Sequence, residues 1–211
     1  PRPIPQAARD FTEEEIQELL KAGLITRVFD SPWASPIHLV PKRGSKKWRM
    51  CIDFRAVNEV TEPFAGTIPL IDELLASIKG KSILSTFDLT SAYHQCPIAE
   101  EDRIKTTFAT PMGNFMFVRV PYGLKNAVQY YCQAVAGIMR PIAVNQPDAL
   151  IAAYLDDVIV GSATFDRHCE LLEDFLNICV ANRCKISLEK SHVGCKEVSY
   201  LGYRVNSKYY T

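Results

Sequence analysis

The chain has 211 residues, of which 47% are hydrophobic and 23% are charged. These proportions are typical of a globular protein and exclude collagen-like, coiled-coil and intrinsically disordered classes. The 24 basic and 24 acidic side chains cancel, so any binding to nucleic acid must come from a local patch of charge. The best candidate for a membrane span, residues 149–160, contains two aspartates, and no membrane partner is expected.

The cysteine pattern and the first residues indicate the setting of the chain. Seven cysteines form no regular framework, which favours reduced thiols in an intracellular compartment over a disulfide scaffold. The cysteines and histidines between residues 168 and 195 include no Cys-x-x-Cys motif, which favours core cysteines over a zinc site. The sequence starts without an initiator methionine or a signal core, so a piece of a longer polypeptide is expected.

The N-terminal region predicts a short helix followed by a hairpin. Thr12 and Glu15 have the spacing of a capping box, and Gly23 follows the last apolar position of the helix. Strands are predicted at residues 35–41 and 48–54, on either side of a glycine-containing turn that carries several basic residues. The result is a hairpin with a basic tip.

The order of the later elements predicts the fold class. These elements are a helix from Pro69 to Gly80, a strand at 82–89, a helix at 126–140 that Pro141 ends, strands at 149–155 and 158–161, a helix at 165–182, and a strand at 198–205. From the first strand onward the order is β-α-β-β-α-β, which predicts an α+β fold with a split βαβ, ferredoxin-like antiparallel sheet and two helices on one face. The section at 96–126 and the N-terminal hairpin are expected to form a smaller lobe.

Three carboxylates are the strongest candidates for chemistry. Asp156 and Asp157 are adjacent between two apolar strands, and Asp88 ends another apolar strand. The predicted sheet makes these strands neighbours, so the three groups should meet at one edge, where like charges require a cation. Oxygen ligands suit Mg²⁺, and metal pairs serve phosphoryl transfer. The alternatives are an ordinary hairpin turn for Asp156 and Asp157 and an N-terminal cap of the turn at 89–93 for Asp88.

The basic tip of the hairpin is the second candidate. Five cations lie in the eight residues from Lys42 to Arg49. Such runs usually form a solvated face, and Lys46 and Lys47 fit that interpretation. In a chain without net charge the tip is also suited to hold a triphosphate or a phosphodiester backbone, with Lys42 and Arg49 flanking the turn.

Five sequence blocks in order give the chain a resemblance to a known family. From residue 11 to the end it is similar to the fingers and palm of reverse transcriptases from gypsy-type LTR retrotransposons or retrovirus-like elements. The blocks are WRMCIDFRAVN at 48–58, FDLTSAYHQ at 87–95, VPYGLKNA at 120–127, YLDD at 154–157 and YLGY at 200–203.

The resemblance implies a reaction and a set of site residues. The activity would be RNA-directed DNA polymerisation, which transfers dNTPs to a primer 3′-hydroxyl on an RNA or DNA template with two Mg²⁺ ions, or Mn²⁺ in their place. Asp88, Asp156 and Asp157 would be catalytic and would bind the metal. Lys42, Arg49, Tyr93, Tyr122 and Lys190 would bind the nucleotide, with Tyr93 as a gate against ribose and Lys190 as a proton donor. Tyr200, Leu201, Gly202 and Tyr203 would position the primer.

The resemblance also implies domains and partners. Residues 1–62 and 96–126 would form the fingers, and residues 63–95 and 127–211 the palm. A thumb is absent from the sequence, so weak or no activity in isolation is expected. The partners would be the rest of the polymerase, namely thumb, connection and RNase H, and the location the cytoplasm, within virus-like particles of a retroelement. The rival interpretations are a non-catalytic scaffold that binds RNA or protein and a metal-dependent nuclease.

Overall fold

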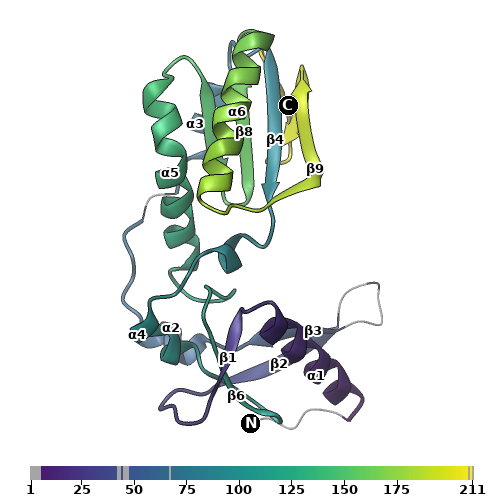
Figure 1. The fold of residues 1–211 in the computed structure, drawn as a ribbon, viewed down its shortest axis with the longest axis vertical. Coiled ribbons are helices and arrows are strands. Elements are labelled where there is room, and N and C mark those ends of the chain that lie inside the picture. Colours follow the sequence, from purple (N-terminus) through teal and green to yellow (C-terminus); the bar gives the residue numbers. More distant parts are fainter. Residues whose placement is uncertain (1–5, 42–43, 45–47, 67, 209, 211) are drawn as a thin grey trace. The chain divides into compact units, whose positions relative to one another are not determined.

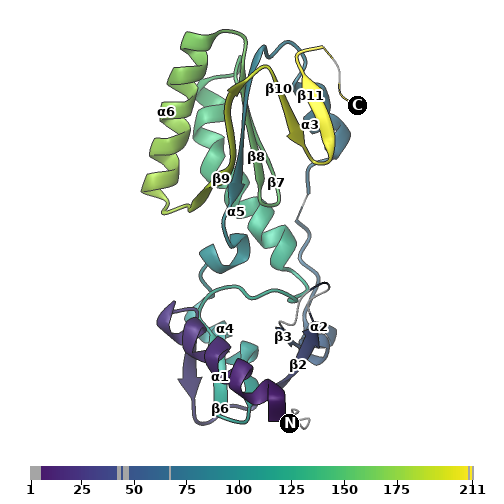
Figure 2. The ribbon, with the colours of Figure 1, turned by 90° about the vertical axis from the view of Figure 1, so that its right-hand side faces the viewer.

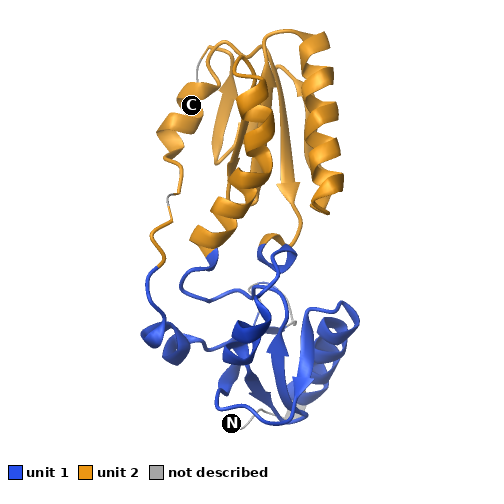
Figure 3. Ribbon diagram, turned by 60° about the vertical axis from the view of Figure 1, so that its left-hand side comes forward, with its two compact units in different colours: residues 1–63, 93–127 blue, residues 64–92, 128–211 orange. Residues whose placement is uncertain are grey.

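The computed structural model describes residues 6–41, 44, 48–66, 68–208 and 210. The chain divides into two compact units, each assembled from two separate stretches (Figure 3). Residues 1–63 and 93–127 make the first unit, and residues 64–92 and 128–211 make the second. None of the helices within the described ranges is both long and apolar enough to cross a membrane.

The first unit is a mixed sheet with a helix packed on it. Its strands follow the order β1-β6-β5-β2-β3, in which only the β2–β5 pair is parallel among the described strands. The elements are α1 (Gln6–Lys21), β1 (Ile25–Val28), β2 (Ser35–Pro41), β3 (Trp48–Ile52), α2 (Arg55–Val60), the 3-10 helix η1 (Ala92–Gln95) at the boundary, α4 (Glu100–Arg103), the 3-10 helix η2 (Ile104–Thr106), β5 (Phe108–Thr110) and β6 (Gly113–Phe117).

Aromatic residues fill the core of the first unit. Phe108, Phe115 and Phe117 lie side by side. The ring centroid of Phe108 is 6.0 Å from that of Phe115 and 5.2 Å from that of Phe117. Ile16 of α1 is buried in the same cluster. The helix starts at Gln6, so the predicted start at Thr12 is wrong. Thr12 is buried inside the helix, and its hydroxyl donates to the carbonyl of Ala8 at 2.7 Å, a bond that satisfies the side chain without a cap.

The second unit contains an antiparallel sheet with the strand order β7-β8-β4-β9 (Figure 1 labels β8, β4 and β9, and Figure 2 labels β7). This is the order of a split βαβ sheet, and it confirms the predicted fold class. The elements of the unit are α3 (Ile71–Ser77), β4 (Ile83–Leu89), α5 (Ala127–Asn145), β7 (Leu150–Tyr154), β8 (Asp157–Ser162), α6 (Phe165–Ala181), β9 (Ile186–Cys195), β10 (Glu197–Tyr200) and β11 (Tyr203–Asn206).

Both faces of this sheet are covered. Helices α5 and α6 lie on one face, and α3 with the β10–β11 hairpin lies on the other (Figure 2). On the helix face Phe87 packs against Phe175 of α6 with ring centroids 4.7 Å apart. The opposite face has its own buried cluster, which consists of Leu75, Ile78, Leu84, Leu150, Ile159, Val198, Tyr200 and Val205. Because both faces are covered, most residues of β4 and β8 are buried, including the polar Ser85, Thr86 and Ser162.

Three predictions for the second unit are wrong in detail. The strand predicted at 198–205 is instead the β10–β11 hairpin, and the fourth strand of the sheet is β9. Pro141 does not end its helix, because α5 continues to Asn145 with Met139 and Ile142 buried on either side of the proline. Burial of this face offsets the cost of the proline. Helix α3 starts at Ile71 rather than at Pro69.

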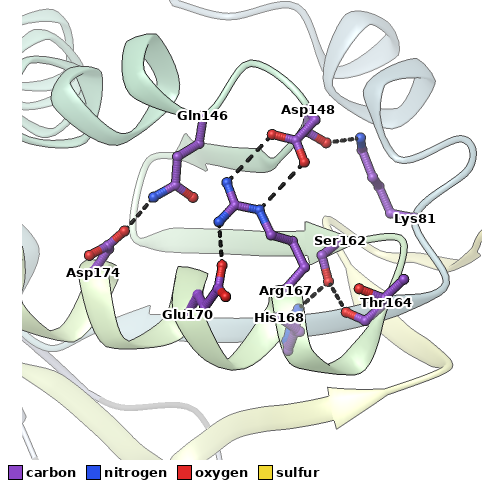
Figure 4. Close-up of polar contacts among 9 residues, drawn as sticks. All are labelled: Lys81, Gln146, Asp148, Ser162, Thr164, Arg167, His168, Glu170 and Asp174. Atoms are coloured by element: carbon purple, nitrogen blue, oxygen red, sulfur yellow. Dashed lines mark hydrogen bonds and ion pairs between the residues drawn. The ribbon is translucent and has the colours of Figure 1, made fainter.

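A buried polar network joins α6 to the sheet on the helix face. His168 lies between Ser85 of β4, at 2.7 Å from Nε2, and Ser162 of β8, at 3.1 Å from Nδ1. Ser162 donates to the carbonyl of Thr164 (Figure 4), so Nδ1 must carry the proton. Nε2 then accepts from Ser85, whose oxygen accepts from the N–H of Gly194 in β9. Every group in the network is satisfied only while His168 is neutral.

More exposed ion pairs surround this network at the same end of the unit. The guanidinium of Arg167 contacts Asp148 at 3.5 Å and Glu170 at 2.6 Å, and Lys81 donates to the backbone carbonyl of Asp148 (Figure 4). Arg167 lowers the pKa of the Asp148 carboxyl. Exposed pairs of this kind contribute little stability, so the buried network is the stronger link between α6 and the strands.

We expect acid to destabilise the chain through His168. Burial lowers the pKa of His168. Below the ordinary histidine pKa of about 6.5, this side chain therefore binds a proton in the unfolded chain but not in the folded chain. The network's contribution is complete above that pH and is lost as the pH falls below it. Urea unfolding of wild type and His168→Leu at pH 7.5 and pH 5.5 measures this. The variant should be less stable by about 2 kcal/mol at pH 7.5, because Ser85 loses its acceptor, and should lose less stability on acidification.

The matched control is His192→Leu, because His192 is an exposed histidine of β9 in the same unit. This variant should keep the wild-type pH dependence. An identical loss of stability on acidification in wild type and His168→Leu would contradict the assignment.

Candidate active site

The three aspartates are brought together by the pairing of β4 with β8. Asp88 lies directly opposite Asp157 in the ladder, and the backbone N–H of Leu89 donates to the carbonyl of Asp156 at 2.8 Å. Asp156 occupies the tight turn between β7 and β8, whose ends pair through Tyr154 and Asp157. The predicted meeting of the three groups at one edge of the sheet is confirmed.

Strand alternation decides which face of the sheet carries the carboxylates. Side chains directly opposite each other in an antiparallel pair share a face, as do alternate residues along a strand. Leu84, Thr86 and Asp88 therefore point to the face covered by α3 and the β10–β11 hairpin. Asp157 and Ile159 of β8 point to the same face. The carboxylates lie where the apolar cluster of that face ends.

The electrostatics of the site follow from this proximity. Loss of water raises the pKa of Asp156, and the negative charge of Asp88 raises it further. The pKa of Asp157 is raised by the same loss of water and by the charges of Asp156 and Asp88, although the residue is exposed to solvent. Two neighbouring carboxyl groups that both resist ionisation mark an excess of negative charge.

Lys190 of β9 supplies a positive charge to this cluster. Its Nζ lies 3.0 Å from Oδ2 of Asp88. The lysine reaches that position through an irregular stretch of β9. Thr86 pairs with His192 and Asp88 pairs with Ser187, so β9 advances five residues while β4 advances two. Such bulges re-aim side chains, and Lys190 lies within this one. The cation that the sequence required is therefore partly provided by the chain itself.

Backbone strain and a thiol define the turn that carries Asp156. Leu155 has a φ of 53°, in the left-handed region that non-glycine residues avoid. Its N–H donates to the thiol of Cys132 on α5. Burial raises the pKa of Cys132, as does the nearby charge of Asp156. Cys132 thus connects the helix layer to the carboxylate turn, and its role was not predicted, because a lone helical cysteine gives no signal of a backbone partner.

The β10–β11 hairpin borders the carboxylates. Its two turn residues, Leu201 and Gly202, have φ values of 51° and 85°, the pattern of the tight turn that favours glycine. The buried Tyr200 donates from its hydroxyl to the carbonyl of Asp157 at 3.4 Å. Burial and the charge of Asp157 raise the pKa of Tyr200, so the phenol stays protonated as a donor. Tyr203 pairs with Tyr200 across the turn and is exposed.

The donor chemistry of the cluster fits a divalent metal ion. Three carboxylates provide only oxygen ligands, which hard ions such as Mg²⁺ prefer. Loss of water and the neighbouring negative charges raise the pKa values of Asp156 and Asp157, and a bound cation would offset both effects. In the arrangement seen, no group of three or more His, Cys, Asp or Glu side chains within the described residues is placed to hold a metal ion together. The ligands are therefore adjacent but not preformed as a coordination shell.

The residues predicted to bind the nucleotide lie in the first unit, apart from Lys190. Tyr93 of η1 packs edge to face on Tyr122 with ring centroids 5.1 Å apart, and His94 contacts the same ring at 5.3 Å. Tyr122 is 56% exposed, so this aromatic group presents a surface to solvent. Arg49 is exposed on β3, opposite Val40. Lys42 lies outside the described residues.

We expect removal of one site charge to stabilise the fold. The raised pKa of Asp156 means that its ionised form opposes folding, a cost that is present at neutral pH and is lost as the pH falls through the raised pKa. Asp156→Asn should therefore raise the free energy of unfolding at pH 7.5, by about 0.5–1 kcal/mol after allowance for solvent screening. Urea unfolding measures the difference. The control Glu189→Gln, at an exposed position beside Lys190, should change little, and a less stable Asp156→Asn would refute the charge argument.

Comparison with known proteins places the chain in a family. Residues 40–205 match the sequence model of the family described as reverse transcriptase (RNA-dependent DNA polymerase). Retrovirus-related Pol polyproteins from the Drosophila melanogaster transposons opus and gypsy are 38% and 34% identical to it, each over 97% of this chain and 20% of the relative. A Schizosaccharomyces pombe Tf2-3 polyprotein is 29% identical over 99% of the chain and 15% of its own length. The chain thus spans about a fifth of these curated relatives.

Solved structures agree with the sequence comparison. A foamy viral protease-reverse transcriptase in complex with an RNA/DNA hybrid superposes with a TM-score of 0.85 at 25% identity, over 99% of this chain and 27% of that chain. A second form of that enzyme, in complex with double-stranded DNA, gives a TM-score of 0.82 at 26% identity over 97% of this chain and 35% of its own. The resemblance inferred from the five sequence blocks is confirmed, and the chain belongs to the reverse transcriptase family.

Proposed function

We propose that the chain is the polymerase part of a retroelement Pol polyprotein and transfers dNTPs to a primer 3′-hydroxyl on an RNA or DNA template. The observation that carries the proposal is the convergence of Asp88 and Asp157 across one ladder, with Asp156 in the adjoining turn, in a chain of this family. The first unit corresponds in this proposal to the fingers and the second to the palm.

The proposed reaction forms a bond between the primer 3′-oxygen and the α-phosphorus of the dNTP and releases pyrophosphate. Divalent metal ions, which the family uses, would activate the 3′-hydroxyl and stabilise the charge on the phosphates. Asp88, Asp156 and Asp157 would hold these ions, two of Mg²⁺ or Mn²⁺. Lys190, beside Asp88, would donate a proton to the leaving pyrophosphate.

The remaining proposed contacts follow from exposure and chemistry. The half-buried ring of Tyr93 and the exposed ring of Tyr122 suit packing against a sugar, where a ribose 2′-hydroxyl would clash. Arg49 is an exposed cation and would hold the triphosphate together with Lys42. The hairpin turn at Tyr200, Leu201, Gly202 and Tyr203 borders Asp157 and would position the primer end.

The template is proposed from the related structures. Those foamy viral enzymes were solved with an RNA/DNA hybrid and with double-stranded DNA, which supports a nucleic-acid duplex as the partner of this chain. Because the net charge is zero, binding must rest on local cations and should weaken steeply with salt.

Primer extension tests the proposal directly. With Mg²⁺, dNTPs and a primed RNA template, the wild type should extend the primer, and Asp156→Asn should lower the rate by roughly 10³-fold, because loss of metal binding removes several kcal/mol of transition-state stabilisation. Since the same variant should be more stable, unfolding would not explain the loss. Asp166→Asn, an exposed aspartate on α6, serves as control and should retain activity. No extension by wild type even when it is joined to the rest of the polymerase would favour the scaffold alternative, and cleavage without synthesis would favour a nuclease.

Substitution of Lys190 separates its charge from its proton. Lys190→Met should lower stability slightly, because Asp88 loses its ion pair, and should slow extension by about 10²-fold, the scale of general acid catalysis. Lys190→Arg keeps the charge but holds its proton too tightly to donate it. Stability should then stay at the wild-type value while the extension rate falls as in Lys190→Met. Full activity of Lys190→Arg would show that only the charge matters, and Lys196→Met provides an exposed control.

A further inference from the structure

The C-terminal end of α6 has a specific hydrogen-bonded form. Beyond the last helical residue, Ala181, the N–H of Arg183 donates to the carbonyl of Val180 at 3.1 Å, and the N–H of Cys184 donates to that of Cys179 at 2.8 Å. Arg183 has a φ of 56°. These two bonds around a left-handed residue define a Schellman motif, with Cys179 at position C3 and Cys184 at position C″.

The Schellman motif brings the side chains of C3 and C″ into contact, usually as an apolar pair. Here both positions are cysteine, and both are free thiols. The two side chains hydrogen-bond each other. The two cysteines are five positions apart in the sequence, so no Cys-x-x-Cys pattern reveals the pair. The backbone geometry of the helix end therefore creates a vicinal dithiol that the sequence pattern did not predict.

The two sulfurs have different environments. Cys179 is 2% exposed and lies on the buried face of α6, whereas Cys184 is partly open to solvent. The hydrogen bond from Cys179 lowers the pKa of Cys184, and the same bond, together with burial, raises the pKa of Cys179. The accessible sulfur is thus the one with more thiolate character, which is the form that attacks disulfides.

We propose that Cys179 and Cys184 form a redox-reactive dithiol that low-molecular-weight disulfides convert reversibly to an intramolecular disulfide. The Cys184 thiolate attacks one sulfur of the reagent, whose S–S bond breaks and releases one thiolate. Cys179 then gives up its proton and attacks the Cys184 sulfur of the mixed disulfide, and the second reagent thiol leaves. The two protein thiols are oxidised, and one reagent disulfide is reduced to two thiols. This proposal does not rest on the proposed polymerase function.

Glutathione disulfide is the probe for the experiment. The reduced chain is incubated with it, remaining thiols are alkylated, and the products are identified by peptide mass spectrometry. Wild type should give a bridge between Cys179 and Cys184 that dithiothreitol removes. Cys179→Ala should stop at glutathione bound to Cys184, and Cys184→Ala should form neither the bridge nor an adduct at the buried Cys179. Circular dichroism of each variant checks that it is folded, and Cys184→Ala carries the test if Cys179→Ala does not fold.

Cys169 provides the matched control on the same helix. It is exposed and lies in the helix body, so Cys169→Ser should leave the bridge unchanged. Glutathione on Cys169 without any bridge between Cys179 and Cys184 would overturn the proposal. So would a bridge that forms only in urea, because the pairing would then belong to the unfolded chain rather than to the helix end.

Discussion

Carboxylates of like charge face each other across the β4–β8 ladder, and the second unit is organised around that constraint. A regular antiparallel register places Asp88 opposite Asp157, and the tight turn adds Asp156 beside them. Loss of water and, after it, this proximity raise the pKa values of Asp156 and Asp157, and both effects cost stability. Lys190 offsets part of the cost. The remainder must be carried by packing elsewhere in the unit, because nothing in the ladder itself separates the charges.

The two faces of the sheet divide these tasks. On the helix face, Ser85, Ser162 and His168 form a buried network in which every donor has an acceptor, and Phe87 packs on Phe175. On the other face the apolar cluster ends at the carboxylates, and strained residues gather there. Leu155 and Leu201 both adopt left-handed backbone conformations, each at a cost of roughly 1 kcal/mol or more. The helix face, where every polar group of this network has a hydrogen-bond partner, thus stabilises the sheet whose opposite face carries charge and backbone strain suited to a reaction. Such a division is common at functional sites.

Sequence reasoning found the carboxylates because apolar strands with a terminal aspartate stand out from their surroundings. It found the sheet order because the alternation of strands and helices along the chain specifies a split βαβ sheet. It missed β9, because this strand is largely exposed and its bulges break the two-residue alternation by which strands are recognised. It misplaced the start of α1 because Thr12 satisfies its hydroxyl inside the helix, and it ended α5 at Pro141 because burial on both sides of a proline is a tertiary effect. The Cys179–Cys184 contact depends on the conformation of Arg183, which no sequence pattern specified.

The strand that sequence reasoning missed, β9, carries Lys190 and so sets the position of the only lysine that contacts Asp88 among the described residues. If β9 continued in the register set by Thr86 and His192, Lys190 would stand directly opposite Asp88 in the ladder. Instead the strand takes up three additional residues before Ser187 pairs with Asp88, and the lysine reaches Asp88 from the bulge with its side chain 67% exposed. An ammonium group fixed in a regular ladder would be a permanent counter-ion. One held from an irregular, exposed stretch loses little packing when it moves, so it is free to leave Asp88 when another cation or a phosphate arrives.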